Sequence, residues 1–387
     1  MLSIPVSQLI FSHVTSLNYA NRSIIDTSGT MTQFRWNYPC SVVHNQINHT
    51  SYLVEDSLSS RIIKIVHAQV PHERDQISVW GIMTNLSLGH LLLVPERHRT
   101  RQYYLIASSR REIYSFSEDG RRTHLAGAPS GSAQYANGHG PESRFAKIDA
   151  IAMDSLGRLL IADSNNHCIR RLTVNDTRDT IVTTMAGSTR IGFLDHVDPL
   201  LAEFRFPGGI CMDPQDNCFV SDTGNHRIRR IDSITGLVTT IVASGEMSIT
   251  PAIGYDHHDP PTVFLSSPRQ IVYEHTNNGL FVLDSNSNRI QFVSLMNGQL
   301  ITVAGTTMNG YVDGPGHQAI FKDIGGIALE KIEPLPGWIS DVAAHPPFLT
   351  WPPGLFDIID SYIPRTILLL VADYFNGTVR RVELVIS

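Results

Sequence analysis

The feature that most constrains this sequence is a hairpin pattern that recurs along the chain. Its clearest copy, CFVSDTGNHRIRRID over residues 218–232, has a short apolar run, a polar turn around Gly224, and a second run in which charged and apolar residues alternate. Alternation with period two and a Gly-Asn turn predict two antiparallel strands joined by a tight turn. Related segments surround Asp56, Asp163, Asp222, Asp284 and Asp373, and a degenerate copy has Ser108 in place of the aspartate.

Two further patterns flank the hairpins. A step into an apolar run precedes them, as in Pro207-Gly208-Gly209-Ile210, and a β-rich run ending in Ala-Gly follows, as at Gly187 and Gly305. Each repeat therefore predicts four short strands, which cannot bury both faces of their sheet alone. Six such sheets stacked radially can, so the sequence predicts an all-β, six-bladed β-propeller of four-stranded antiparallel blades. In this alignment Trp80 begins the first strand of the second blade.

The two ends of the chain are expected to complete each other. The last repeat stops after its third strand, and residues 1–30 contain no repeat of their own. An open propeller would expose an unpaired strand edge, so we expect the N-terminal segment 1–30 to supply the missing outer strand and close the ring. Residues 1–387 are then a single propeller domain, with a Pro- and aromatic-rich insertion at 331–364 in the last blade.

The combination of Asp-x-x-Asn-His-x-Ile-Arg-Arg with a preceding Phe-x-x-Pro-x-Gly-Ile resembles the NHL repeat. The match extends over most of the chain and is strongest around Asp163 and Asp222. The resemblance implies a six-bladed β-propeller. The resemblance does not indicate which function this chain has, because the family has RNA-binding, protein-binding and enzymatic members.

The acidic residues of the turns resemble a site but are expected to be structural. The pattern repeats from blade to blade, as a requirement of the fold would, whereas a binding site is localised. Short carboxylates and amides at a turn bond the turn's own backbone. The residues to which we assign this role are Asp163, Asp222, Asp284, Asp373 and Asn225.

The arginines that follow the turns allow two interpretations. They could form a basic rim for RNA phosphates, or each could lay its stem over a neighbouring blade and pair with an acid. The net charge of -6 favours the second interpretation. These residues are Arg170, Arg171, Arg227, Arg229, Arg230, Arg380 and Arg381.

The first strand of each blade should line the central channel. The residues expected there include one acid, Asp149, and one base, Arg269, which could pair across the channel. Propeller enzymes of the lactonase type place several carboxylate and amide ligands for calcium around the same ring of channel residues. The histidines of Asp256-His257-His258-Asp259 are adjacent in a Pro-flanked loop and make a poor zinc site. The sequence therefore predicts no metal, no cofactor and a protein that is not an enzyme. The six channel positions are Cys40, Trp80, Asp149, Gly208, Arg269 and Gly325.

The longest departures from the repeat are the best candidates for partner binding. An insertion this long is usually functional or disordered, and its aromatic content argues against simple disorder. It could cover the propeller itself or dock a partner. The second blade carries a basic loop that should lie on the same side of the ring. The residues predicted to contact a partner are Trp338, Phe348, Trp351, Phe356, Tyr362, Arg97, Arg99 and Arg101.

We therefore expect a protein-interaction scaffold or a subunit of a larger assembly, with protein partners. An RNA-binding propeller is the alternative, and a metal-dependent hydrolase or lyase is a third possibility. The absence of a transmembrane segment or a good signal peptide favours an intracellular or organellar location over secretion, without fixing the compartment. Cys211 and Cys218 flank a turn and could face each other, although two separate buried thiols are favoured over a disulfide.

Overall fold

A computed structural model describes most of the chain. The described residues are 9–17, 23–25, 31–33, 39–45, 50–55, 59–66, 76–84, 88–94, 105–117, 120–128, 134–174, 179–242, 264–334, 365–373 and 378–386.

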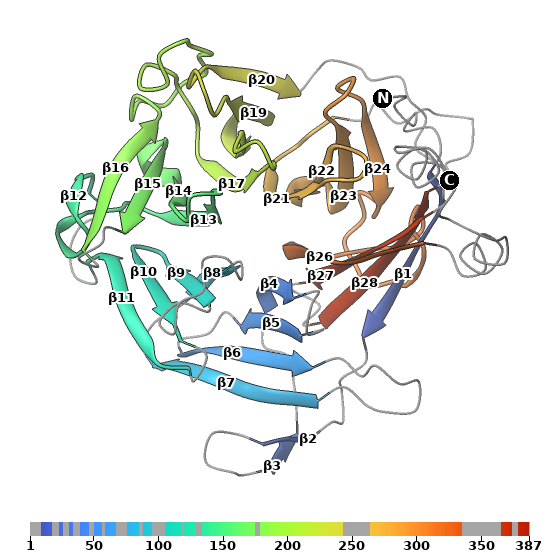
Figure 1. The fold of residues 1–387 in the computed structure, drawn as a ribbon. Helices are drawn as coiled ribbons and strands as arrows, with labels where there is room; N and C mark the ends of the chain where they lie inside the picture. The colour runs from blue at the N-terminus through green and yellow to red at the C-terminus, as the bar shows by residue number, and fades with distance from the viewer. Residues whose placement is uncertain are drawn as a thin grey trace, which may run out of the picture.

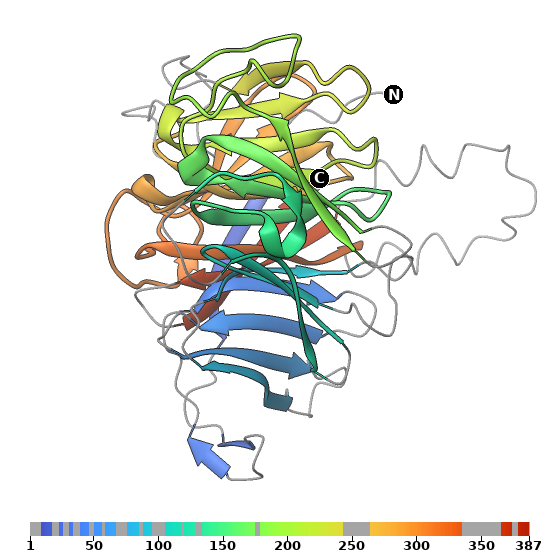
Figure 2. The ribbon, with the colours of Figure 1, turned by 90° about the vertical axis from the view of Figure 1, so that its left-hand side faces the viewer.

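The protein is an all-β, six-bladed β-propeller, as the sequence predicts. Six antiparallel sheets are arranged around a central axis (Figure 1), and the side view shows their strands stacked through the thickness of the ring (Figure 2). In each blade the first strand of the meander is innermost, and neighbouring first strands pack against one another around the ring.

Each of the first three blades contains four strands, and blades 1 and 3 have short additional strands at their outer edges. Blade 1 contains β4 (Pro39–Asn45), β5 (Thr50–Glu55), β6 (Ser59–Val66) and β7 (Gln76–Thr84), extended by β2 (Ser23–Ile25) and β3 (Met31–Gln33); blade 2 contains β8 (Leu88–Leu93), β9 (Leu105–Ser109), β10 (Glu112–Phe116) and β11 (Arg122–Gly127); blade 3 contains β13 (Ile148–Met153), β14 (Leu159–Asp163), β15 (Cys168–Val174) and β16 (Thr180–Ala186), extended by β12 (Gly138–His139).

The second half of the ring follows the same plan. Short 3-10 turns join the second and third strands of blades 3, 4 and 5, and a further 3-10 turn precedes β13. Blade 4 contains β17 (Pro207–Met212), β18 (Cys218–Asp222), β19 (Arg227–Ile231) and β20 (Val238–Val242); blade 5 contains β21 (Pro268–Glu274), β22 (Gly279–Asp284), β23 (Arg289–Ser294) and β24 (Leu300–Ala304); blade 6 contains β26 (Ile324–Pro334), β27 (Arg365–Asp373), β28 (Thr378–Ile386) and β1 (Leu9–Leu17), with β25 (Gly314–Pro315) beside it; the 3-10 turns are η3 (Gly140–Glu142), η4 (Ser164–Asn166), η5 (Thr223–Asn225) and η6 (Ser285–Ser287).

The N-terminal strand closes the ring. β1 lies antiparallel to β28, with Leu9 opposite Ile386 at one end and Leu17 opposite Val379 at the other. The strand from the start of the chain thus becomes the outer strand of the blade formed by its end. This confirms the predicted closure of the ring by an N-terminal strand.

The packing between blades explains why both faces of each sheet are apolar. The side chains of Phe204 and Val220 belong to a core cluster between blades 3 and 4, whereas Phe219, the neighbour of Val220 on β18, packs into the cluster between blades 4 and 5. Every residue of β18 is buried. Burying successive side chains on opposite faces requires sheets on both sides, and the closed ring supplies them.

The same alternation separates two cysteines. Cys218 packs with the cluster facing blade 3, whereas Cys211 lies against the cluster facing blade 5. In the register of β17 and β18, Cys211 is opposite Phe219 and Cys218 is opposite Met212. The two thiols therefore lie on opposite faces of one sheet, and both are free.

The sequence placed Trp80 wrongly. It lies in β7, the outer strand of blade 1, and the first strand of blade 2 is instead β8, with Gly89 at the position we gave to Trp80. The aromatic-glycine-apolar step at Trp80 matches the expected signature, but an outer strand has the same alternation. The chain reaches the next inner strand only at Leu88.

Among the residues that the structure describes, no helix is long and apolar enough to cross a bilayer.

Candidate functional site

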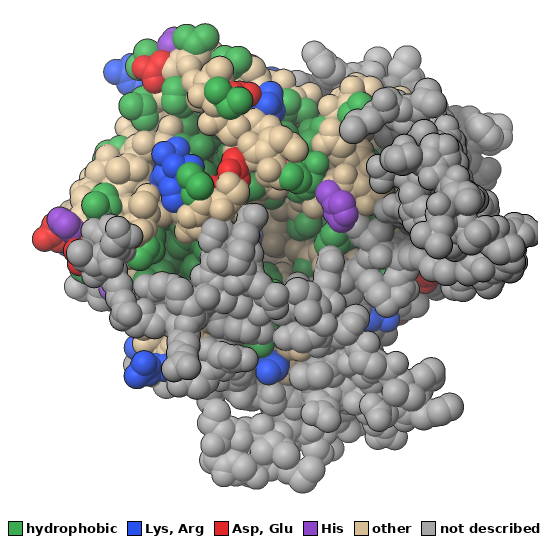
Figure 3. All heavy atoms as spheres, viewed as in Figure 1, with side chains coloured by type: hydrophobic (Ala, Val, Ile, Leu, Met, Phe, Trp, Pro, Cys, Tyr) green, Lys and Arg blue, Asp and Glu red, His purple; other side chains and the backbone are tan. Residues whose placement is uncertain are grey.

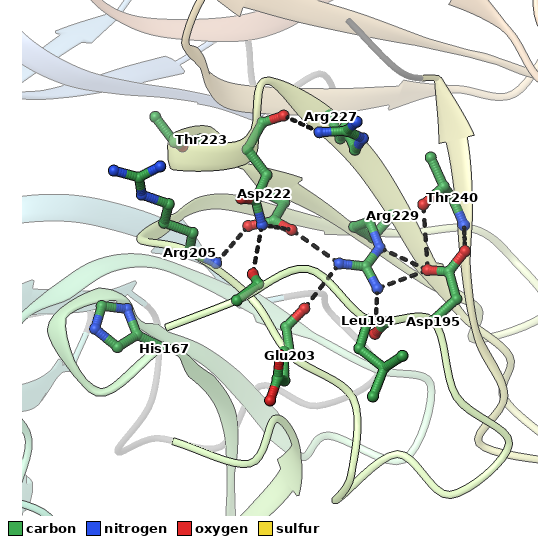
Figure 4. Close-up of polar contacts among 12 residues, drawn as sticks. His167, Leu194, Asp195, Glu203, Arg205, Asp222, Thr223, Arg227, Arg229 and Thr240 are labelled. Carbon is green, nitrogen blue, oxygen red and sulfur yellow. Dashed lines mark hydrogen bonds and ion pairs between the residues drawn. The ribbon is translucent and has the colours of Figure 1, made fainter. Parts of the chain in front are cut away.

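Two parts of the ring gather polar side chains, and the first is the buried pair of Asp222 and Arg229. Neither side chain is exposed, and Arg229 Nη1 lies 2.8 Å from Asp222 Oδ2 (Figure 4). Asp222 Oδ1 accepts a hydrogen bond from the backbone N–H of Arg205, and its Oδ2 accepts one from Asn225 Nδ2. The carboxylate thus binds the connecting segment that leads into blade 4 as well as the turn.

Arg229 holds the segment that connects blade 3 to blade 4. Its guanidinium donates to the carbonyls of Glu203 and Leu194 and to the carboxylate of Asp195, which is 2.6 Å from Nη2 (Figure 4). The guanidinium also lies between two aromatic rings, 4.9 Å from the centroids of both Phe193 and Phe204. Such cation–π contacts are stronger when they are desolvated.

The same arrangement recurs in blades 3 and 6. Arg170 pairs with Asp163 at 3.0 Å, and Arg380 pairs with Asp373 at 3.1 Å; all four side chains are fully buried. Each guanidinium is again close to two rings. They are Tyr135 and Phe145 for Arg170, and Tyr311 and Phe321 for Arg380.

Blade 5 replaces the arginine with Gln291. Its Nε2 donates to Asp284 Oδ2 at 3.0 Å and to the carbonyl of Phe264 at 3.2 Å, so the hydrogen bonds are partly kept but the charge is lost. Burial raises the pKa of Asp284, opposed by hydrogen bonds from Ser287 and Ser266 and by the charge of Arg289. Blade 5 thus keeps the network around Asp284, but no guanidinium of the described residues contacts its carboxylate.

These contacts distinguish between the two interpretations of the arginines, a basic rim for RNA phosphates and pairing with acidic residues. Arg170, Arg229 and Arg380 are completely buried in ion pairs, so they are not available to phosphates. Arg230, which is partly exposed, pairs with Asp232. The arginines hold connecting segments to blades, as the pairing interpretation proposed, and this weakens the RNA-binding alternative.

The histidines of the turns have a backbone role. His167 and His226 end the 3-10 turns with φ of 54° and 57°, in the left-handed region, and Asn288 does so in blade 5. His and Asn are among the residues that adopt this conformation more readily. His167 also accepts a hydrogen bond through Nδ1 from the backbone of Phe206, the residue that precedes β17.

The second polar region is the mouth of the central channel. Each innermost strand has an irregular register at its start, so that one residue bulges out of the pairing. A bulge bends the strand and redirects its side chain. The residues at the second position of these strands are Cys40, Gly89, Asp149, Gly208, Arg269 and Gly325, in blade order.

One step further along the strands, His90 and Gln270 meet across the axis. They belong to β8 and β21, in blades 2 and 5 on opposite sides of the ring, and their Nε2 atoms are 3.4 Å apart. Gln270 Oε1 accepts a hydrogen bond from the backbone N–H of Ile327 in blade 6. This bond orients the amide, so that its NH₂ group donates to His90 Nε2.

The orientation of Gln270 also determines the tautomer of His90. Because Nε2 is the acceptor, the proton of the neutral imidazole is on Nδ1, and this buried atom has no hydrogen-bond partner among the described residues. Burial lowers the pKa of His90 to about 4, although the charge of Asp149 acts in the opposite direction. His90 is therefore a neutral group in the channel at pH 7.

The two charged residues predicted for the channel have different surroundings. Asp149 pairs with Lys147, whose Nζ is 2.8 Å from Oδ1. Arg269 is exposed, and its side chain makes no hydrogen bond, ion pair or ring contact with another described residue. The pair that the sequence suggested between Asp149 and Arg269 is not formed, because Lys147, two residues from Asp149 on the chain, occupies its carboxylate.

Other predicted site residues cannot be placed. The basic loop with Arg97, Arg99 and Arg101 lies outside the described residues, as does 335–364, which contains the aromatic residues predicted to bind a partner. The first part of the predicted insertion, 331–334, belongs to β26. Within the described parts of the chain, no group of three or more His, Cys, Asp or Glu side chains is arranged to hold a metal ion.

The fold and the buried Asp-Arg turns define the class, a six-bladed β-propeller built from repeats. The model of the NHL repeat matches residues 145–172 and 204–231, and the chain is accordingly an NHL-repeat β-propeller. These two repeats include the Asp163–Arg170 and Asp222–Arg229 pairs described above.

Similar proteins are distant. The chloroplastic protein SUPPRESSOR OF QUENCHING 1 of Arabidopsis thaliana is 29% identical over 216 residues, which are 51% of this chain and only 18% of that protein. An auxiliary nutrient binding protein of Bacteroides thetaiotaomicron has a TM-score of 0.57 at 14% identity, covering 96% of this chain and 76% of its own. Virginiamycin B lyase of Staphylococcus aureus has a TM-score of 0.50 at 12% identity, covering 97% of this chain and 100% of its own.

The likeness to the lyase corrects one expectation. The residues expected in the channel led us to predict that the protein is not an enzyme, and that prediction was wrong, because a lyase has this same propeller architecture. At this level of identity the similarity concerns the fold alone and does not transfer a reaction.

Proposed function

We propose that this propeller binds a protein partner through the connecting segment 188–206, which leads from β16 to β17. The segment contains six large apolar side chains that are between 43% and 73% exposed. Contiguous exposed apolar surface is uncommon on isolated proteins and often marks an interaction site. The six residues are Ile191, Phe193, Leu194, Val197, Leu200 and Leu201.

The fold accounts for only part of this exposure. The ring of Phe193 stacks on Arg227 and Arg229, so an aromatic residue is needed there to cover the guanidinium groups. Tyr135 and Tyr311 do the same in blades 3 and 6 and are similarly exposed. Within the described part of the chain, no comparable contact accounts for the exposure of Val197 and Leu200. Their apolar surface is what supports a partner.

The surrounding surface is suited to protein recognition. Apolar side chains are visible over blades 3 to 5 on the face shown in Figure 3, with a hollow near the axis. Arg190 is exposed, and Asp198 uses its carboxylate to accept the backbone N–H of Leu200. An apolar centre with charged residues at its rim is the usual composition of a protein interface.

The insertion predicted from the sequence is a separate candidate. Connections from first to second strands leave a propeller on the side opposite to those that join consecutive blades. A partner bound through 335–364 and one bound through 188–206 would therefore use different surfaces, and variants of the two can be tested independently.

A double variant tests the proposed surface. Val197→Asp with Leu200→Asp places two charges on the exposed segment and should abolish capture of a cross-linked partner from the native source. Leu156→Asp is the matched control, because Leu156 is 68% exposed in the turn between β13 and β14. All three proteins should melt at similar temperatures, and equal capture by the double variant and the wild type would refute the proposal.

A further inference from the structure

The second positions of the innermost strands alternate in size around the channel. Gly89, Gly208 and Gly325 occupy blades 2, 4 and 6, between the side chains of blades 1, 3 and 5. Gly89 is exposed, and among the described residues a Cβ added there would meet only the carbonyl oxygen of Ser108, at 3.9 Å. The backbone at Gly89 therefore does not require glycine, and its small size leaves open space at the mouth.

The charge at these positions is unbalanced. The carboxylate of Asp149 is paired with Lys147, whereas the guanidinium of Arg269 is exposed and has no partner among the described side chains. An exposed guanidinium can bind a carboxylate or a phosphate through two parallel hydrogen bonds. Among the described residues, Arg269 is thus the charged group of these six channel positions that has no counter-charge.

The channel is closed just below Arg269. The next residue on the chain, Gln270, reaches across the axis to His90. The backbone N–H of Ile327 holds the amide in place from the neighbouring blade. A ligand at the mouth would rest on this neutral pair, and a polymer could not thread through without breaking it.

We propose that the channel mouth is a binding site for a small anion that carries a carboxylate or a phosphate, with Arg269 as its charge partner. The open space at Gly89 admits the ligand, and the His90–Gln270 pair sets the depth of the site. The site is independent of the protein-binding segment 188–206, because the two share no residue.

Calorimetric titration of the full chain with citrate and with inorganic phosphate tests this site and distinguishes the two anions. At least one should bind with a Kd of about 1 mM or tighter. Arg269→Gln should weaken that binding about tenfold or more, as expected for loss of a charge-assisted pair. Its melting temperature should stay the same, since the Arg269 side chain makes no hydrogen bond or ion pair with any residue that the structure describes.

Two further variants distinguish a specific anion site at the channel mouth from non-specific attraction of anions to exposed arginines. Gly89→Phe should block binding by filling the mouth, in a position where its Cβ meets no close neighbour. Arg190→Gln removes an exposed arginine outside the channel and should bind as the wild type does. The proposal is overturned if neither anion binds the wild type, if Arg269→Gln or Gly89→Phe binds normally, or if Arg190→Gln is weakened as much as Arg269→Gln. Normal anion binding by the Val197→Asp, Leu200→Asp double variant would show that this site stands apart from the proposed protein interface.

Discussion

Gln270 and His90 join opposite blades of the ring through a contact of 3.4 Å between their Nε2 atoms. The contact spans the axis, so it closes the channel between two strands that share no sheet. It depends on a neutral imidazole, because a protonated His90 would present an N–H to the NH₂ group of Gln270.

We expect the stability of the protein to fall in mild acid because of His90. Its pKa of about 4 in the folded protein is below the ordinary value of 6.5, so the unfolded chain takes up the proton first as the pH falls. The contribution of neutral His90 to the free energy of unfolding is complete above pH 6.5. It declines between pH 6.5 and 4 and changes no further below pH 4. We expect a loss on the order of 1–2 kcal/mol, allowing for partial exposure.

Denaturant unfolding at pH 7 and pH 4.5 measures this effect. His90→Gln should lose less stability between the two pH values than the wild type. His139→Gln, at an exposed position on β12, should keep the wild-type difference. An identical acid response in His90→Gln and the wild type would show that His90 does not contribute.

Asp222→Asn should destabilise the protein much more than Asp284→Asn. The first leaves Arg229 buried without the carboxylate at 2.8 Å, and breaking a buried pair costs about 3–5 kcal/mol. The second removes a carboxylate that faces the neutral amide of Gln291, so no buried charge is left unpaired, and the change should cost about 1 kcal/mol or less. Urea unfolding at pH 7 compares the two, and equal losses would contradict the distinction between the blades.

Removal of β1 should lower thermal stability sharply. Deleting residues 1–17 leaves the outer edge of β28 unpaired along its length, from Val379 to Ile386. We expect the melting temperature to fall by about 10 °C or more. A synthetic peptide of residues 9–17 should restore part of the loss by adding the strand in trans. A melting temperature that the deletion leaves unchanged would argue against closure of the ring by this strand.

We expect no binding of a single-stranded RNA oligonucleotide near 0.1 M salt. The most regular arginines of the repeats, Arg170, Arg229 and Arg380, are buried against aspartates and cannot release counterions from phosphates. Fluorescence anisotropy over a salt series measures this directly. Tight binding with a steep dependence on salt would restore the RNA-binding alternative.

The repeated hairpin was sufficient to predict the blades, because the residue pattern of each copy predicts two strands and the turn between them. The error at Trp80 shows the limit of that reasoning, since alternation alone does not distinguish an inner strand from an outer one. The aspartates were placed at their turns, but their main contacts were not foreseen. Asp222 accepts from the backbone of Arg205, seventeen residues away, as well as from the turn.

His90 and Gln270 were missed altogether. They stand 180 residues apart, and neither belongs to a motif. Comparison of the third position of each innermost strand gives the only signal. Large polar side chains occur there in blades 2 and 5, whereas blades 3, 4 and 6 have Ala150, Gly209 and Gly326.

By itself, the sequence determined the number of blades, the strands of the clear repeats and the closure of the ring, because these follow from local periodicity and from the need to bury both faces of each sheet. The tertiary structure decided which polar groups meet. It buried Arg229 beside two aromatic rings, left Arg269 without a partner among the described residues and brought His90 to Gln270. Contacts across an axis depend on the closed ring and not on distance along the chain.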